Sequence, residues 1–361
     1  MLLTRPYNQE PRTQMTDWLA PQTLQTAHGL PAFVYTDPDV AARERSMFRC
    51  SWQLVARGDQ LAQSGDHVVE DIAGLPVLIA RAPDGTLLGF HNVCRHRGGP
   101  LVIACGSGLK QLRCHYHGWT YDWDGVLRSG PELDALVDFD RAQVRLPAIA
   151  VVQWQGLVFA SIEPEAPFDA LVDGIDARVG SALREVRFQR RVSYIAQCNW
   201  KAYIDNYLEG YHVPHIHPAL NRLLDYREYR TECMDGYALQ SSPLDAAESF
   251  YGLGEALYYQ LWPNTMLNIL PGRLQTNRVV PLGVDRCRID FDYYYAPDVA
   301  RDTAKIAADQ DLAEVTQRED IDICERVQRA FASGSYNTGR VHPTREQGVH
   351  WFQERYRRAL A

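Results

Sequence analysis

The sequence predicts an α+β fold in which a small domain with an antiparallel sheet precedes a larger domain of sheet and helices. Short runs of β-forming residues beside tight-turn dipeptides indicate the first domain, as at 67–80 and 119–123. Helical periodicity at 199–212 and 317–331 indicates helices in the second domain. With 361 residues, the chain is long enough for two such domains.

The first domain is expected to present two loops at the tips of its strands. Strands are predicted at 67–72 and 75–80, and Asp84-Gly85 is a hairpin signal after them. Another strand is predicted at 119–123, followed by the turn Asp124-Gly125. The segments between these strands therefore form short, exposed loops.

Both loops carry a cysteine followed closely by a histidine. Cys94 and His96 are two residues apart, Cys114 and His117 are three apart, and seventeen residues separate the pairs. Two thiolates and two imidazoles in this order suit a mixed-ligand [2Fe–2S] cluster, in which histidines replace cysteines on one iron. A structural zinc site is the alternative, since zinc uses the same residue types. Glycines at 98–99 favour the cluster, because they let the backbone approach inorganic sulfide.

A second group of metal-ligand residues lies on the helix predicted at 199–212, which Pro214 is expected to end. At about 100° per residue, Asp205, Glu209 and His212 fall on one helical face. Two carboxylates and an imidazole are therefore expected to point in the same direction.

Beyond Pro214, a second histidine can fold back toward His212. Two histidines and one carboxylate with open coordination positions bind Fe(II) and activate O₂ in non-haem oxygenases. His217 is the preferred second histidine, and the spacing leaves His215 as an alternative.

The carboxylate ligand is expected on the helix at 317–331. Asp320 shares its face with apolar residues, whereas Asp322 aligns with Arg326 on a charged face. A carboxylate on the buried face needs compensation, which a metal ion supplies. Asp320 is therefore the predicted ligand and Asp322 a solvated acid.

Together, these motifs resemble the catalytic subunit of the Rieske non-haem iron oxygenases, and residues 45–160 resemble the Rieske domain family. The resemblance implies a small antiparallel β Rieske [2Fe–2S] domain and a helix-grip type catalytic domain with an antiparallel sheet flanked by helices. The expected divisions are an N-terminal extension packing on the catalytic domain at 1–44, the Rieske domain at 45–160 and the mononuclear iron domain at 161–361. In the family, the mononuclear iron is held by residues that match His212, His217 and Asp320.

The resemblance also implies how electrons travel. Electrons come from a separate reductase or ferredoxin, so NAD(P)H and flavin act only through that partner, and O₂ is the co-substrate. Glu209 would link the iron ligand His212 to a cluster histidine, His117, of a neighbouring subunit in a head-to-tail homotrimer. Asp205 is a further polar position nearby, and both acids are expected to act in catalysis.

Three C-terminal stretches resemble the branch of the family that acts on choline, glycine betaine, carnitine and stachydrine: 323–328, 335–340 and 346–350. The expected activity is hydroxylation or N-demethylation of a small methylated, quaternary amine. Aromatic residues at 250–251 and 258–262 suit a quaternary cation, but they suit a packed core or a flat aromatic acid equally well. Ring hydroxylation of an aromatic acid is therefore the alternative activity, and a non-catalytic Rieske electron carrier is the alternative outside enzymes.

Composition narrows the range of partners. The formal net charge is −8, which provides no basic footprint for nucleic acid. Neither a secretory signal nor an apolar stretch of membrane-spanning length is present, so a cytoplasmic protein without membrane contact is expected. Cys105 lies between the two ligand loops and is interpreted as an isolated buried thiol.

Overall fold

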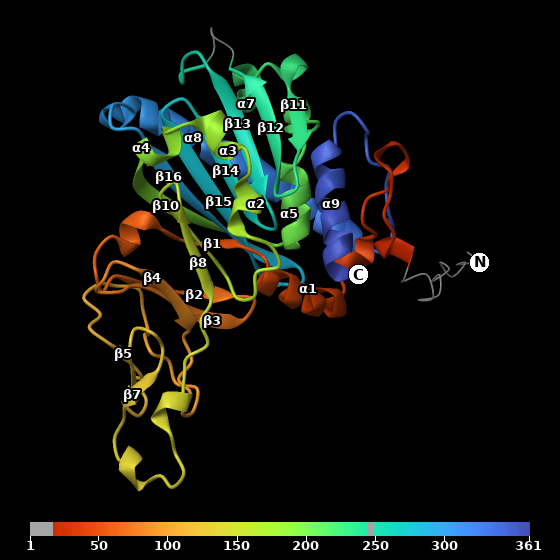
Figure 1. The fold of residues 1–361 in the computed structure, drawn as a ribbon. Coiled ribbons are helices and arrows are strands. Elements are labelled where there is room, and N and C mark those ends of the chain that lie inside the picture. The colour runs from red at the N-terminus through yellow and green to blue at the C-terminus, as the bar shows by residue number, and fades with distance from the viewer. Residues whose placement is uncertain (1–16, 245–248) are drawn as a thin grey trace, which may run out of the picture.

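Antiparallel sheets and packed helices confirm the α+β prediction (Figure 1). The computed structural model describes residues 17–244 and 249–361. Among the helices of this described part, none has both the length and the apolar character needed to cross a membrane.

Three small sheets form the N-terminal half of the described chain. The first has the order β1-β9-β8, with bounds Gln53–Arg57, Leu157–Ser161 and Ala150–Trp154. The second has the order β2-β3-β4, with bounds His67–Ile72, Leu75–Arg81 and Leu87–His91. The third has the order β5-β6-β7, with bounds Leu112–Arg113, Thr120–Tyr121 and Leu127–Ser129. The predicted hairpin turns at Asp84-Gly85 and Asp124-Gly125 fall between β3 and β4 and between β6 and β7.

A larger antiparallel sheet carries the C-terminal half. Within the described residues it has seven strands in the order β10-β16-β15-β14-β13-β12-β11. Their bounds, from β10 to β16, are Arg187–Ala196, Arg230–Cys233, Tyr237–Pro243, Glu255–Leu261, Thr265–Leu270, Arg273–Gly283 and Arg286–Tyr295. Neighbouring strands from β11 to β16 are joined in sequence order, so this part of the sheet is a meander.

Helices pack around this sheet. Their bounds, from α1 to α9, are Pro38–Cys50, Phe168–Val172, Ile175–Val179, Ala182–Glu185, Trp200–Tyr207, Val213–Ile216, Pro218–Leu223, Thr303–Ala332 and Gln347–Leu360. The long helix α8 packs against α5 and α7, which brings segments about one hundred residues apart in sequence into contact.

The helix predicted at 199–212 is shorter than expected. It ends at Tyr207, and Pro214 lies in the first turn of the next helix, α6, instead of ending the first. Gly210 favours the break, since glycine costs about 1 kcal/mol in a helix interior. Proline also has no N–H to continue the ladder of hydrogen bonds. A Cβ at Gly210 would approach the Tyr229 ring to 2.7 Å, so the broken segment packs closely here.

The segment before the first sheet is anchored on the C-terminal half through Glu44 of α1. Its buried carboxylate accepts hydrogen bonds from Lys201 Nζ at 2.5 Å, Trp200 Nε1 at 2.8 Å and the Tyr356 hydroxyl at 2.6 Å. These contacts place α1 beside α5 and α9 (Figure 1). Helix α1 runs through residue 45, where the division between extension and Rieske domain is predicted. The two predicted domain boundaries remain a proposal.

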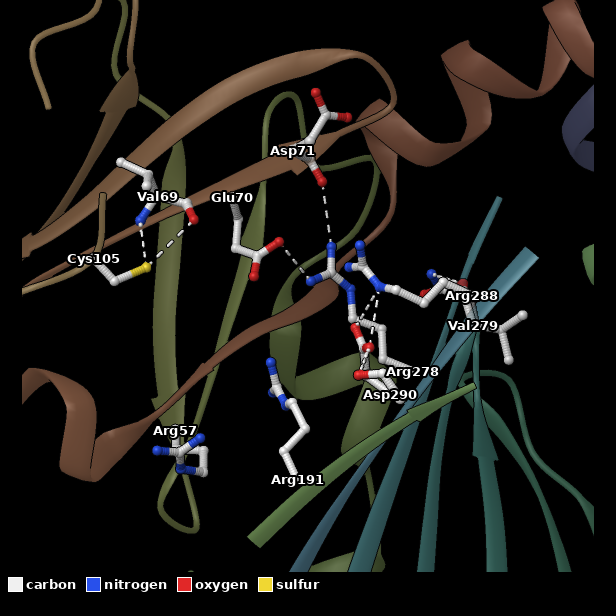
Figure 2. Close-up of polar contacts among 12 residues, drawn as sticks. Arg57, Val69, Glu70, Asp71, Cys105, Arg191, Arg278, Val279, Arg288 and Asp290 are labelled. Atoms are coloured by element: carbon white, nitrogen blue, oxygen red, sulfur yellow. Dashed lines mark hydrogen bonds and ion pairs between the residues drawn. The ribbon is translucent and has the colours of Figure 1, made fainter. Parts of the chain in front are cut away.

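Figure 2 shows the contact between the second small sheet and the large sheet, where Arg278 of β15 reaches β2. Its Nη1 lies 3.0 Å from Glu70 Oε2, and its Nη2 donates to the Asp71 carbonyl at 3.3 Å. The Arg278 side chain is 7 % exposed, so this ion pair is largely shielded from solvent. A charged contact therefore joins the two halves of the molecule.

Cys105 corrects one sequence-based expectation. Its thiol is exposed, not buried. Its Sγ lies 3.5 Å from Val69 N and 3.7 Å from Val69 O, beside the edge of β2 (Figure 2). The prediction was wrong because the loop that carries Cys105 pairs with the edge strand β2 through a bridge between His67 and Gly106, and the thiol stays exposed there.

Candidate metal centres

The two predicted cluster loops lie against each other. Cys94 and His96 follow β4, whereas Cys114 and His117 follow β5. A hydrogen bond from His115 N to Pro100 O, at 3.1 Å, joins the loops.

The four side chains divide into a buried pair and an outward pair. The Cys94 and Cys114 thiols are 2 % and 3 % exposed, whereas His96 is exposed and His117 is half-buried. The imidazole ring centroids are 4.6 Å apart. The structure thus brings the predicted ligands together, with sulfur inside and imidazole outside.

Several groups around these loops fit a cluster with inorganic sulfide. The Tyr121 hydroxyl lies 3.1 Å from Cys94 Sγ, and Tyr116 N donates toward Cys114 Sγ at 3.4 Å. Such hydrogen bonds to sulfur tune the potential of iron–sulfur centres. A Cβ at Gly99 would approach Cys114 Sγ to 3.0 Å, so a side chain there would crowd the sulfur. Within the described chain, His117 Nδ1 is buried and has no hydrogen-bond partner, which suits a metal ligand.

A second set of ligand atoms converges where α5, α6 and α8 meet. His212 Nε2 and His217 Nε2 are 3.1 Å apart, and Asp320 Oδ1 lies 3.0 Å from His217 Nε2 and 3.7 Å from His212 Nε2. One ligand atom from each residue lies within 4.8 Å of the others, a spacing at which they could hold one metal ion. Asn206 Nδ2 donates to Asp320 Oδ1 at 2.6 Å and fixes that carboxylate.

The alternative residues point elsewhere. His215 is exposed on α6. Asp322 forms an ion pair with Arg326 at 2.7 Å, and both side chains are 61 % exposed. The geometry therefore selects His217 over His215 and Asp320 over Asp322 as the residues gathered at this point.

Each converging histidine is held from behind by a carboxylate. Glu209 Oε1 lies 2.6 Å from His212 Nδ1, and Glu319 Oε2 lies 2.7 Å from His217 Nδ1. A carboxylate at Nδ1 fixes the tautomer that leaves Nε2 free as a metal ligand. Burial disfavours the charged form of His217, yet the Asp320 and Glu319 carboxylates outweigh burial and raise its pKa above the usual range.

Glu319 was not identified as a supporting residue from the sequence. The available signal was its position next to Asp320 on α8. Asp320 approaches Nε2 of His217, and the adjacent acid Glu319 can reach Nδ1 of the same ring. Glu209 was expected beside His212, and it lies there although the helix that was to align them ends at Tyr207.

Asp205 lies away from the converging ligands. Its carboxylate accepts hydrogen bonds from the Tyr35 hydroxyl at 2.5 Å and from Gln353 Nε2 at 3.2 Å. It does not line the cavity described next. Its contacts are with the N-terminal segment and α9, so its expected catalytic role remains a prediction.

A cavity adjoins the histidine and aspartate group and extends along α8 and the face of the large sheet. His212, His217 and Asp320 line one part of it. Apolar and aromatic side chains supply much of its wall: Tyr203, Tyr207, Leu220, Leu223, Tyr229, Leu244, Tyr251, Tyr258, Leu270, Phe291 and Leu312. Such a cavity suits a small molecule held next to the metal-ligand group.

The aromatic segment noted in the sequence divides between cavity and core. Tyr251 and Tyr258 line the cavity. Tyr259 is 1 % exposed and lies 5.3 Å from Tyr237, ring centroid to ring centroid, whereas Trp262 packs on Phe352. Strand alternation explains the division, because successive side chains of β13 point to opposite faces.

Comparisons with known proteins show which families the two parts of the chain match. Residues 51–144 match the Rieske [2Fe-2S] domain, and residues 183–361 match the catalytic domain of the ring hydroxylating alpha subunit. Choline monooxygenase from Arabidopsis thaliana is 32 % identical over 349 residues, which cover 91 % of this chain and 82 % of the relative. The carnitine monooxygenase oxygenase subunit of Escherichia coli K12 is 28 % identical over 342 residues, covering 90 % and 91 %.

A solved structure extends the similarity to the whole fold. A crystal structure of the quaternary ammonium Rieske monooxygenase CntA, in complex with an inhibitor, superposes with a TM-score of 0.84 at 26 % identity. The match covers 96 % of this chain and 98 % of that one. The Rieske match also favours the [2Fe–2S] interpretation of the cysteine and histidine loops over the zinc alternative.

Proposed function

The chain belongs to the Rieske non-haem iron oxygenases, and we propose that it is a terminal oxygenase that hydroxylates an N-methyl or neighbouring C–H bond of a quaternary amine. The observation that carries this proposal is the convergence of His212, His217 and Asp320 on one cavity, in a chain that also has a Rieske domain. An electron carrier has no use for the second site, so the proposal favours an enzyme over a carrier.

We assign two metal groups to the residues described above. Cys94, His96, Cys114 and His117 would hold the [2Fe–2S] cluster, whereas His212, His217 and Asp320 would hold the mononuclear Fe(II). When bound, these groups supply single electrons and activate O₂ for insertion into a C–H bond. The protein contributes the carboxylates Glu209 and Glu319, which hold the two imidazoles with Nε2 directed at the metal position.

A quaternary amine is supported by the relatives and by the wall of the cavity. The relatives named above are monooxygenases of choline and carnitine. Tyr207, Tyr229 and Tyr258 line the cavity, and aromatic rings attract quaternary cations through their quadrupole. Hydroxylation of an N-methyl group consumes O₂, two electrons and two protons, and gives the N-hydroxymethyl product and water. That product then releases formaldehyde and leaves the demethylated amine.

Electrons would come from a separate reductase or ferredoxin and would cross between subunits. The strands β5 and β7 beside the cluster loops lie at the tip of the molecule remote from α7 and α8 (Figure 1). The cluster and the mononuclear site of one chain are thus in different parts of the molecule. We therefore propose a head-to-tail homotrimer in which Glu209 contacts His212 of its own chain and His117 of a neighbouring one.

Metal analysis and turnover test the proposal together. The purified protein should contain about three irons per chain, two in the cluster and one mononuclear. With a surrogate reductase, quaternary amines should stimulate O₂ uptake and release formaldehyde or the hydroxylated product. The His212→Ala variant should keep the visible spectrum of the cluster and lose both the third iron and turnover.

Two results would contradict the proposal. Two irons per chain with no substrate-dependent O₂ uptake would favour an electron carrier. Hydroxylation of benzoate-type aromatic acids without turnover of any quaternary amine would favour the ring-hydroxylating alternative.

A further inference from the structure

The cavity has a polar end that the metal site does not use. Arg273, the first residue of β15, lines the cavity and is 6 % exposed. Its Nε lies 2.8 Å from Asp309 Oδ1 and 3.0 Å from Oδ2. Asp309 is 1 % exposed and also accepts hydrogen bonds from the hydroxyls of Tyr251 and Tyr295. The aspartate is therefore fully occupied by donors and is not available to bind a cation.

The rest of the Arg273 guanidinium is free to bind a ligand. Among the described residues its Nε has a partner, whereas its two Nη groups have none. Unlike the Nε of Arg278, which is buried without a partner, these Nη groups of Arg273 are not among the buried polar atoms that lack a partner in the described residues, so a ligand in the cavity can reach them. The planar fork of an arginine matches the two oxygens of a carboxylate. Asp309 fixes the guanidinium through its Nε. The two Nη groups remain available to a ligand in the cavity.

Gln275 adds a second donor on the same face of β15. It lies two residues after Arg273, so the two side chains point to the same side of the sheet. Gln275 is 3 % exposed, and its Oε1 accepts a hydrogen bond from Asn268 Nδ2 at 2.8 Å. Its Nε2 is buried without a hydrogen-bond partner in the described part of the chain. A buried donor without a partner destabilises the protein, and a ligand oxygen that accepts from it would remove that cost.

The donors and the metal ligands lie at different points along one cavity. Asp309 and Asp320 both lie on α8 and both line the cavity. They are eleven positions apart, or about 16 Å along the helix axis between their Cα atoms, and the side chains that line the cavity at both points shorten the gap that a ligand must span. A molecule held at both ends would place one group near Arg273 and the other near the metal ligands.

We propose that Arg273 and Gln275 form a carboxylate subsite, so that the substrate is a zwitterion with a quaternary ammonium group at one end and a carboxylate at the other. This inference rests on the proposed function and narrows its substrate class. It distinguishes betaine-type acids from choline, which carries a hydroxyl where a betaine carries a carboxylate. The carboxylate binds the fork of Arg273, and the methylammonium end is thereby directed to His212, His217 and Asp320.

Matched pairs of compounds test the subsite on the wild-type enzyme. One pair is glycine betaine and choline, and the other is γ-butyrobetaine and the alcohol made by reducing its carboxylate. Dissociation constants are measured by calorimetry on the holoenzyme without O₂, and turnover is measured with the reductase. In the better-bound pair, the acid should bind at least about 10-fold more tightly than the alcohol, as expected for hydrogen bonds to a charged group.

Substitutions then assign the effect to the two residues. Arg273→Lys keeps a positive charge beside Asp309 but removes the fork, and it should weaken binding of the acid by about 10- to 100-fold while leaving the alcohol unchanged. Gln275→Met should weaken the acid by a smaller factor. Arg355→Lys is the matched control, since Arg355 lies over the Trp262 ring and outside the cavity, and it should change neither compound.

Three outcomes separate this inference from the proposed function. Equal affinity of acid and alcohol in the wild type, or equal weakening of both by Arg273→Lys, would overturn the subsite and leave the proposed function standing. If Arg273→Lys does not fold, the wild-type pairs and Gln275→Met decide the question. If neither member of either pair binds or stimulates O₂ uptake, the proposed function fails and the subsite fails with it.

Discussion

Replacing Asp205 with asparagine tests whether this acid is structural or catalytic. Burial raises the pKa of Asp205 to about 7, although hydrogen bonds from Tyr35 and Gln353 and the charge of Lys201 act in the opposite direction. The usual pKa is 3.8. At 1.36 kcal/mol per pH unit, ionising Asp205 therefore costs about 4 kcal/mol more in the folded protein than in the unfolded chain.

The sign of the pH dependence follows from this shift. The unfolded chain loses the Asp205 proton near pH 3.8, whereas the folded chain keeps it until about pH 7. The stabilisation by the protonated carboxyl is therefore fully present below about pH 4 and is lost as the pH rises to about 7. Asparagine cannot ionise, so the Asp205→Asn variant should escape this loss.

The substitution also has a cost. Asparagine keeps an oxygen for the Tyr35 hydroxyl but turns an amino group toward Gln353 Nε2, which loses one hydrogen bond worth about 1 kcal/mol. Asp205→Asn should then be about 3 kcal/mol more stable than the wild type above pH 7, and the gain should shrink to about 1 kcal/mol or less at pH 5.

Urea denaturation followed by tryptophan fluorescence between pH 5 and pH 8 measures the difference. Asp322→Asn is the matched control, because Asp322 is exposed and Arg326 lowers its pKa, and it should follow the wild type throughout. A gap between Asp205→Asn and the wild type that is the same at every pH would refute the burial argument. Loss of turnover in a folded, iron-loaded Asp205→Asn enzyme would instead support a catalytic role.

Three further substitutions test the site and the contact between the two halves. Asp320→Asn should abolish mononuclear iron binding, measured by iron analysis, whereas Asp322→Asn should retain it; retention by both would require another ligand. Glu319→Ala should weaken iron binding by about 10- to 100-fold in competition with a ferrous chelator, with an unchanged cluster spectrum, and unaltered affinity would contradict its support of His217. Arg278→Met should lower the free energy of unfolding by about 2 kcal/mol, because it leaves Glu70 unpaired in a partly buried contact. An exposed pair such as Arg230 and Glu228 should contribute less than 1 kcal/mol in the same assay, and an equal effect would contradict the importance of burial.

The sequence predicts best where ligand spacing and local turns determine the structure. The cluster loops need only two short turns, so the order of Cys94, His96, Cys114 and His117 was enough to predict their convergence. Asp320 was predicted from one helical face, and helix α8 does extend unbroken through that region. In each case the information lies within a few turns of chain.

Prediction was weaker where tertiary contacts override local pattern. The periodicity at 199–212 predicted an unbroken helix, but the helix ends at Tyr207, and Glu209 reaches His212 from the irregular segment before α6. The helical-face argument also grouped Asp205 with these residues, whereas Tyr35 and Gln353 draw it into a different contact. Those partners are more than one hundred residues away in sequence, so no local pattern could have revealed them.

Strand β15 shows why the polar end of the cavity was not visible in the sequence. Arg273, Gln275 and Asn277 line the cavity, whereas Arg278 points to the opposite face and contacts Glu70. Side chains alternate along a strand, so this division depends on the register of β15 between its two neighbours. A slip by one residue would turn Arg273 away from Asp309 and withdraw Arg278 from the first domain. The same register therefore controls both the proposed carboxylate subsite and the contact with β2, and its determinants are cross-strand partners that lie outside the segment itself.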